Sequence, residues 1–311
     1  MESTQSLKRR IKSVANTSQI TKAMELVAAT KMRKSQEIAL ASRPYAYAAL
    51  EILATVSRIK ELDPPEILVD RPVKKTAFLI VTSDKGLAGS FNSAVIRTFE
   101  RFMKAEKINP ADPACVFVTI GQKAKQYLEN RNLKVWRSFV RTSDFTTVEE
   151  TEPIAEALIN EGYLNQVFDK VIVFSTIFIT ALRQDVMVRT LLPIKFDAIK
   201  ESAAELIPRV GRYAEYIDQE SFSPDISADY LIEPSPAGVL EELAPELFRI
   251  RLYHLLMEAN ASEHSARRVA MKNASDNASD LSRKLRVEYN KLRQDSITRD
   301  IIEITSYASN T

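Results

Sequence analysis

Residues 262–298 read SEHSARRVAMKNASDNASDLSRKLRVEYNKLRQDSIT, and they lie in a longer run, 246–311, that contains neither glycine nor proline. The first 43 residues also lack both residue types, and all six glycines fall between Gly86 and Gly238. Without these helix breakers both ends can form long helices, about 100 Å in length for the C-terminal run. A compact domain is only ~30 to 40 Å across, so such helices must bury their apolar side chains against each other. The sequence therefore predicts a rod made from the two chain ends, with a globular unit inserted between them.

Apolar residues spaced by about 3.5 positions predict that the two ends form an antiparallel coiled coil. The expected stripes are Leu7, Ile11, Val14, Ile20, Met24 and Val27 at the start of the chain and Leu281, Leu285, Leu292, Ile297, Ile301 and Ile304 at its end. Ser18, Thr21 and Ala28 stand where an optimal zipper would place leucine, which indicates a coil shaped for surroundings beyond its own partner helix. An amphipathic helix packed on its own domain explains the periodicity equally well.

The middle of the chain has the pattern of an α/β domain. Short β-branched apolar runs predict strands at 77–82, 114–120, 133–140 and 170–175, with an edge strand at 186–194. Helical patterns lie between them at 92–107, 122–130 and 148–166. This alternation predicts a mostly parallel, Rossmann-like sheet. We expect three parts: an N-terminal coil helix (1–62), the inserted α/β domain (63–238) and a C-terminal coil helix (239–311).

Composition is that of an ordinary folded chain, with 45% apolar and 27% charged residues and a formal charge of +2. The charge is uneven, because residues 8–43 hold nine lysines or arginines against Glu25 and Glu37. No apolar run is long enough to span a membrane, and neither a signal nor a transit peptide is visible. Cys115 is the single cysteine, which excludes an internal disulfide and suits a reducing compartment such as the cytoplasm.

The turn after the first predicted strand, residues 83–92 (SDKGLAGSFN), is the main candidate for chemistry. It matches neither GxGxxG nor a GK[ST] phosphate loop. A nucleotide site there remains an alternative, but the favoured interpretation is a tight turn in which Asp84 and Asn92 satisfy backbone donors. A nucleotide-dependent enzyme would need this turn to hold phosphate.

Other polar groups do not form a catalytic set. His254 and His264 are ten residues apart on one predicted helix and face different directions, so they predict no metal site. Glu149, Glu150 and Glu152 are typical of a solvated acidic helix start rather than of a catalytic carboxylate pair. We therefore expect no catalytic residue, no cofactor and no metal.

Three strings together carry a family resemblance: ITKAMELVAATKMR at 20–33, SEHSARRVAMKNASDN at 262–277, and SDKGLAGSFN. With YNKLRQDSIT at 289–298, they resemble the γ subunit of F-type ATP synthases in that family's order, and the likeness covers nearly the whole chain. The resemblance implies a central rotor shaft that couples rotation of a membrane c-ring, driven by protons or sodium ions, to ATP synthesis or hydrolysis on a hexamer of α and β subunits. It implies a non-catalytic subunit, present once per complex.

The resemblance also implies partners and a location. The partners are α, β, ε and the c-ring, so membrane association is indirect and peripheral, at the cytoplasmic face of the bacterial inner membrane. The basic N-terminal arm would meet an acidic segment of β. A nucleic-acid-binding coil is the competing interpretation of that arm, but the arm lacks interleaved aromatic residues and the C-terminal arm is nearly neutral.

Residues that the resemblance places against the α and β subunits lie on both terminal helices. They are Met24, Lys31, Arg33, Arg267, Gln294, Thr298 and Asp300. The chain departs from the family pattern at Arg268, where an apolar residue is usual, at Asp300, where Glu is typical, and at Tyr307-Ala308 in place of Gly-Ala. Residues 196–225 look longer than in compact bacterial members, and we expect this extension to alter contact with ε or the c-ring.

Overall fold

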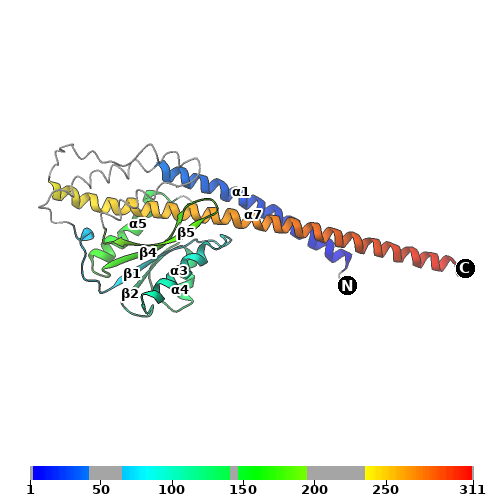
Figure 1. Ribbon diagram of the computed structural model, residues 1–311, viewed down its shortest axis with the longest axis horizontal. Helices are drawn as coiled ribbons and strands as arrows, with labels where there is room; N and C mark the ends of the chain where they lie inside the picture. The colour runs from blue at the N-terminus through cyan, green and yellow to red at the C-terminus, as the bar shows by residue number, and fades with distance from the viewer. Residues whose placement is uncertain (1–2, 42–64, 141–145, 195–234, 310–311) are drawn as a thin grey trace. The chain divides into compact units, whose positions relative to one another are not determined.

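The computed structural model describes residues 3–41, 65–140, 146–194 and 235–309 (Figure 1). The chain separates into two compact units, one of residues 1–28 with 267–311 and one of residues 29–266. Helices α1 (Thr4–Ala41) and α7 (Pro236–Ser309) each contribute to both units. The expected boundary at 62/63 and the extension at 196–225 lie outside the described residues, and the boundary at 238/239 falls inside α7.

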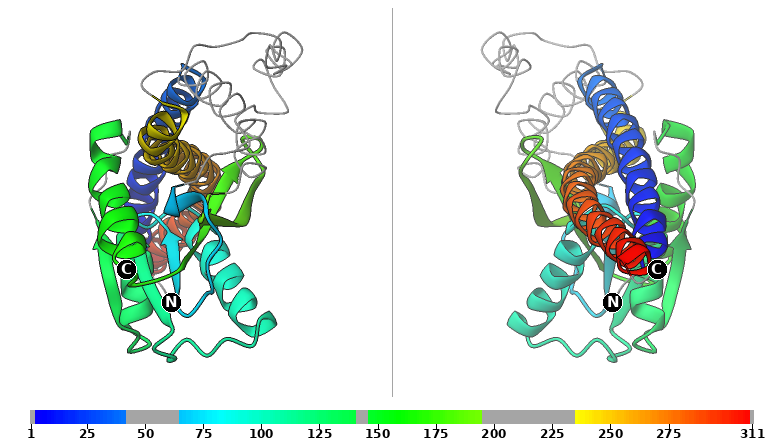
Figure 2. Two further views of the ribbon diagram at one scale, coloured as in Figure 1. Left: turned by 90° about the vertical axis from the view of Figure 1, so that its left-hand side faces the viewer. Right: turned by 90° about the vertical axis from the view of Figure 1, so that its right-hand side faces the viewer.

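In the unit of residues 1–28 and 267–311, α1 and α7 lie side by side and antiparallel, which confirms the coil predicted from the chain ends (Figures 1 and 2). Buried or half-buried side chains recur along each helix at alternating steps of four and three. These seam residues are Leu7, Ile11, Val14, Ser18, Thr21, Glu25 and Ala28 on α1, and Arg268, Met271, Ser275, Ala278, Ser282, Leu285, Tyr289 and Leu292 on α7.

The predicted stripe was wrong in part. Leu7, Ile11 and Val14 lie in the seam as expected, but Ile20 and Val27 are 60% and 54% exposed, and Met24 is half-buried at its margin. The step from Val14 to Ile20 is six residues, which rotates the stripe away from the face that the four-and-three pattern keeps toward α7. Leu285 and Leu292 also lie in the seam. Leu281, Ile297 and Ile301 are exposed, and the side chain of Ile304 is outside the described set.

The other unit contains a five-stranded sheet in the order β3-β2-β1-β4-β5, which confirms the mostly parallel α/β domain. The strands are β1 (Thr76–Val81), β2 (Cys115–Ile120), β3 (Val135–Phe139), β4 (Lys170–Phe178) and β5 (Gln184–Leu192). The first four are parallel neighbours, and β5 pairs antiparallel with β4 at one edge, as expected for the last run.

Each face of the sheet has its own apolar core. Phe78 and Ile80 of β1 point to one face, where they pack with helices α3 (Phe91–Ala105) and α4 (Gln122–Glu129). Leu79 and Val81 alternate to the other face, as strand geometry requires. There they pack with the helical segment 148–164 and with the part of α7 near Leu247–Leu256. Figure 2 shows α3 and the segment 148–164 on opposite sides of the sheet.

The helix predicted over 148–166 consists of two kinds of turn. It begins as α5 (Val148–Glu156) and continues as a π-helix, η2 (Ala157–Leu164). A π-helix aligns residues five apart, so Leu158 and Tyr163 lie on the same buried side. Gly162 is required there, because a Cβ atom would overlap the ring of Phe168. Gly162 therefore allows the ring of Phe168 to pack directly against this turn.

Helix α7 begins earlier than the breaker pattern predicts. Pro236 and Gly238 occupy its first turn, where the missing proline N–H is not needed. The Ser235 hydroxyl accepts a hydrogen bond from the Gly238 amide at 3.2 Å, which caps this end. The helix then continues through Pro245. Within the described parts of the chain, no helix is both long and apolar enough to cross a membrane.

Candidate functional site

The turn of residues 83–92 is held by its own side chains. The amide of Ser83 donates to Asn92 Oδ1 at 2.9 Å, and Asn92 Nδ2 donates to Ser83 Oγ at 2.7 Å. Asp84 reaches across to the next helix, where its Oδ1 accepts the Gln122 amide at 2.8 Å. Asp84 and Asn92 thus satisfy backbone donors, which confirms the structural interpretation of this turn.

The start of α4 is the place where a parallel sheet of this kind could hold a phosphate. Its amides already have protein acceptors: Asp84 takes Gln122, the Ser83 carbonyl takes Lys123 at 3.2 Å, and Thr82 Oγ1 takes Ala124 at 2.8 Å. Because the carboxylate of Asp84 stands where a phosphate would bind, the geometry argues against a nucleotide at this turn.

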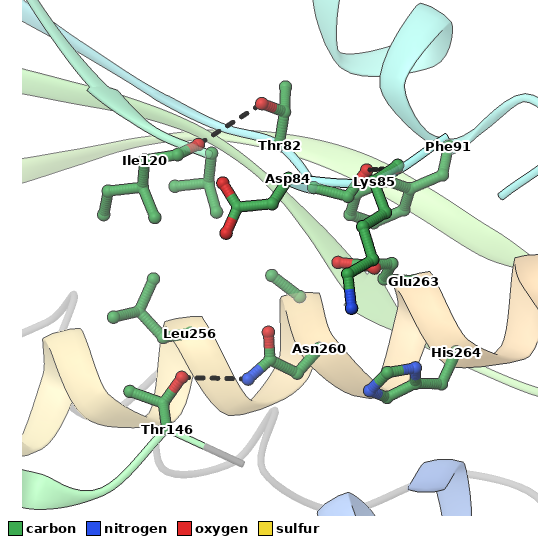
Figure 3. Close-up of a pocket in the computed structure, with 13 residues that line it drawn as sticks. Thr82, Asp84, Lys85, Phe91, Ile120, Thr146, Leu256, Asn260, Glu263 and His264 are labelled. Atoms are coloured by element: carbon green, nitrogen blue, oxygen red, sulfur yellow. Dashed lines mark hydrogen bonds between the residues drawn. The ribbon is translucent and has the colours of Figure 1, made fainter. Parts of the chain in front are cut away.

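A pocket of about 410 Å³ lies beside the turn, between the carboxyl ends of β1 and β2 and helix α7 (Figure 3). Asp84 and Lys85 enter it from the turn, and Asn260 and His264 enter it from α7. Asn260 donates to Thr146 Oγ1 at 2.9 Å. The lining mixes charges of both signs with apolar side chains such as Leu256.

The two histidines of α7 lie in different surroundings. Both are buried, but only His264 is among the residues that line this pocket. Within the described ranges, no group of three or more histidine, cysteine or carboxylate side chains is arranged to hold a metal ion.

The acidic residues at 149–152 serve the helix start, as predicted. Thr147 and Glu150 form a reciprocal capping box at the N-terminus of α5. Hydrogen bonds from its own backbone amide and from Thr147 lower the pKa of Glu149. Glu152 pairs with Arg249 at 2.9 Å. The contacts of Glu149 and Glu150 stabilise the start of α5, whereas that of Glu152 joins α5 to α7.

On the coil, the register places Met24 and Arg267 on the same side. Ser18 lies opposite Ser275, so Glu25, seven residues further along α1, lies opposite Arg268, seven residues back along α7. Met24 and Arg267 each precede one of these seam residues. In an antiparallel pair this places them on the same side of the coil and at nearly the same height. Both side chains are half-buried.

The register also places Arg268 opposite Glu25 in the seam. Glu25 is only 8% exposed, and its carboxylate accepts a hydrogen bond from Lys22 Nζ at 2.9 Å. Arg268 is half-buried and stands at the same level of the seam. The register therefore puts a cation opposite a buried carboxylate.

The remaining predicted contact residues do not gather at one point. Lys31 is half-buried and Arg33 is exposed, and both lie in the unit of residues 29–266. Gln294, Thr298 and Asp300 are exposed on α7 beyond its last seam residue. Gln294 and Thr298 share a face, because they are about 40° apart around the helix axis. Asp300 is about 160° from Thr298 and therefore lies on nearly the opposite side of the helix. These three residues do not form one stripe.

Sequence reasoning missed the apolar residues on the outside of the coil. Ile20, Leu26 and Val27 of α1 are 54–60% exposed, and Ile301 and Ile302 of α7 are 55% and 59% exposed. The missed signal was the four-and-three pattern that starts at Leu7, because it places residues 20, 26 and 27 away from the seam. Leu26 with Val27 and Ile301 with Ile302 are adjacent exposed apolar pairs, and contiguous apolar surface is typical of sites that meet other proteins.

An α/β domain inserted in sequence between two chain ends that form an antiparallel coil, with large apolar side chains exposed on that coil, defines a class of coiled-coil proteins. Comparison of the sequence with known proteins shows which family of that class the chain belongs to. A family model described as ATP synthase matches residues 3–310. The ATP synthase gamma chain of Opitutus terrae is 38% identical over 307 residues, covering 98% of both chains. That of Geotalea daltonii is 35% identical over 308 residues, covering 99% of this chain and 98% of the relative.

Solved structures agree. A chain of the Tetrahymena thermophila mitochondrial ATP synthase, from a structure of its central stalk and c-ring, is 25% identical with a TM-score of 0.56 and covers 82% of this chain and 99% of its own. A chain of the Euglena gracilis mitochondrial ATP synthase has a TM-score of 0.61 at 16% identity, covering 98% and 93%, and shows the shared fold. The chain belongs to the family of ATP synthase gamma chains.

Proposed function

We propose that this chain is the central rotary shaft of an F-type ATP synthase. It couples ion-driven rotation of a membrane c-ring to ATP synthesis or hydrolysis at sites on a hexamer of α and β subunits. The observation that carries the proposal is the antiparallel coil of the chain ends, whose seam leaves Ile20, Leu26 and Val27 on the outside. Relatives that are gamma chains over nearly their full length support it.

The mechanism requires that the shaft contact the sites on its partners unequally. A rotor shifts the equilibrium of a site only by interacting differently with that site's open and closed states. The coil of residues 3–28 and 267–309 has two unlike helices, and the side that carries Met24 and Arg267 differs from the other sides. As the shaft turns, each β subunit in succession meets that side.

The contact residues that we propose for the α and β subunits are those implied by the family: Met24, Lys31, Arg33, Arg267, Gln294, Thr298 and Asp300. The excess of cations between residues 8 and 43 gives the shaft an attraction for an acidic segment of β. We place catalysis entirely on the partners, because the only nucleotide-like turn of the described chain fills its helix start with Asp84.

We further propose that residues 1–62 and 239–311 serve the shaft and that 63–238 form its base, where ε and the c-ring bind. The chain would then be present once per complex and peripheral, at the cytoplasmic face of a bacterial inner membrane, without nucleic-acid partners. The extension at 196–225 would modulate contact with ε or the c-ring. Its deletion should change ATPase inhibition by ε or ion coupling, and unchanged values would refute this role.

The test is purification of the native assembly through a tag on this chain. We expect α and β subunits to be recovered with it, and we expect the isolated chain to hydrolyse no ATP. In the assembly, Met24→Ala with Arg267→Ala should reduce ion pumping per ATP hydrolysed. The control Arg101→Ala, an exposed position on α3, should not. Recovery of the chain without α and β, or ATP hydrolysis by the chain alone, would contradict the proposal.

A further inference from the structure

At the centre of the coil two serines bind each other's helix. Ser18 Oγ donates to the carbonyl oxygen of Ser275 at 3.4 Å, and Ser275 Oγ donates to the carbonyl oxygen of Ser18 at 3.3 Å. The two hydroxyl oxygens are 3.5 Å apart. These contacts join residues 257 positions apart in the chain, and both belong to the same compact unit.

A serine side chain is short, so it reaches the backbone of a neighbouring helix only where the two helices are close. The surrounding seam residues permit this approach. Thr21 and Ala278, the next seam residues on their helices, are small, and Thr21 turns its hydroxyl back to the Ser18 carbonyl at 3.0 Å. Small side chains at a helix contact bring the axes together, and large ones hold them apart.

Apolar contacts alone define this register weakly. The seam residues around Ser18 and Ser275 are Val14, Thr21, Met271 and Ala278, of which only Met271 is a long side chain, so few large side chains interlock to specify one alignment. A slip of α7 by about one helical turn would bring Met271 or Ala278 opposite Ser18, and neither side chain has a hydroxyl group to replace that of Ser275. A polar pair inside a coil is the device that selects one register among several of similar stability.

We propose that Ser18 and Ser275 are positioning residues that lock the register of the two chain ends, so that α1 and α7 turn as one body at this level. The lock fixes the height at which Met24, six residues beyond Ser18, meets Arg267, eight residues before Ser275. A slip of one turn would separate these side chains by about 5.4 Å along the coil. The mechanical consequence rests on the proposed shaft function, whereas the register itself does not.

The register is tested on the isolated full-length chain by cross-linking. Cys115 is first replaced by serine, so that Ser18→Cys with Ser275→Cys supplies the only two thiols. Diamide, which takes up the two thiol hydrogens, should convert this variant fully to a disulfide, because the parent oxygens lie 3.5 Å apart. The matched pair Ser18→Cys with Ser282→Cys, one heptad away, should remain reduced. Equal cross-linking of both pairs, or cross-linking of the shifted pair alone, would overturn the register lock.

The mechanical role is tested on the assembled complex. Ser18→Ala with Ser275→Ala should assemble in normal amounts and hydrolyse ATP, but it should pump fewer ions per ATP hydrolysed. The oxidised Ser18→Cys, Ser275→Cys complex should keep full coupling, because the covalent bond replaces the hydrogen bonds.

Full coupling in the double alanine variant would refute the positioning role. Loss of turnover on oxidation that returns on reduction would refute it too, because the helices would then have to move past each other. Absence of α and β subunits would refute the shaft function and leave the cross-linking result intact.

Discussion

In the inserted domain, one carboxylate joins segments at the carboxyl ends of the strands and another joins segments at their amino ends. Asp84 closes the start of α4 from the loop that follows β1. Asp169, just before β4, accepts the Arg71 guanidinium at 2.9 Å on one oxygen and the amides of Lys74 and Lys75 at 2.9 and 3.0 Å on the other. Arg71 also lies 4.1 Å above the ring of Tyr163 and donates to its carbonyl oxygen. Each carboxylate thus joins segments that are distant in sequence.

Replacement of Asp84 by alanine should destabilise the inserted domain. The variant leaves the Gln122 amide at the helix start without its acceptor, and loss of such a cap lowers the free energy of unfolding by about 0.5–2 kcal/mol. Asp84→Asn keeps a side-chain oxygen at this place and should recover most of the stability. Urea unfolding of the full-length chain measures both. A stability of Asp84→Ala equal to that of the parent chain would show that the tether contributes nothing.

Asp169 should make stability depend on pH in the acid range. Burial by itself raises the pKa of this carboxyl, but the amides of Lys75 and Lys74 and the Arg71 guanidinium outweigh burial, and the pKa lies below its ordinary value of 3.8. Because the folded-state pKa is the lower one, the contribution is fully present above about pH 5 and is lost as pH falls through the folded pKa.

The measurement is urea unfolding between pH 3 and pH 7 for the parent chain and for Asp169→Asn. The difference between them should be largest near pH 7, about 1.5–3 kcal/mol for hydrogen bonds to a charged group, and should shrink toward pH 3. Asp185→Asn is the control, since Asp185 pairs with the exposed Arg183 and should change stability by less than about 1 kcal/mol. A difference for Asp169→Asn that grows as pH falls would contradict the assignment.

At the scale of elements, the junction between β2 and α4 depends on the backbone of Gly121. Its φ is +91°, a conformation that residues with a side chain rarely adopt, and a Cβ atom there would overlap the carbonyl oxygen of Thr82. This close approach is what lets Thr82 Oγ1 accept the Ala124 amide. Thr82, immediately after β1, therefore both packs against Gly121 and caps the start of α4.

Gly121→Ala should lower the free energy of unfolding by more than about 1–3 kcal/mol, since backbone strain and a steric overlap add. Gly86→Ala is the matched control, because a Cβ atom at Gly86 would meet no atom within 4 Å. Thermal unfolding of both variants, followed by circular dichroism, separates them. If the two midpoints were equally close to that of the parent chain, the close approach at Gly121 would be wrong.

At the scale of the whole molecule, one chain supplies two compact units whose shared helices, α1 and α7, pass from one unit into the other. In the coil unit α7 continues past its last seam residue, Leu292, and every described side chain from Arg293 to Ile302 is exposed. The end of α7 thus has little contact within its own unit and offers its surface to partners.

Removal of residues 304–311, about two helical turns, should therefore weaken coupling more than assembly. The truncated chain should still recover α and β subunits in normal amounts, whereas ion pumping per ATP hydrolysed should fall. Quantification of subunits in the purified complex, beside the pumping assay, distinguishes the two effects. Complete loss of assembly would show that the tip provides the main attachment.

Much of this protein follows from its linear sequence alone. The absence of glycine and proline in 1–43 and 246–311 determined two long helices, because helix formation is a local property of the backbone. Runs such as AFLIVT, residues 77–82, determined buried strands in the same local way. The turn at 83–92 was also predictable, because its Asp and Asn side chains act on amides nearby or at the next strand end.

Only the tertiary structure decided which side of each terminal helix is buried. Helix α1 carries more than one stripe of apolar residues, and the spacing of Ile20, Met24 and Val27 is as regular as that of the true seam. The partner helix selects Thr21, Glu25 and Ala28 instead, because Ser18 meets Ser275, which is 257 positions away in the sequence. Periodicity is a property of one helix, whereas burial depends on the register of two, and that register is set by contacts that no local pattern contains.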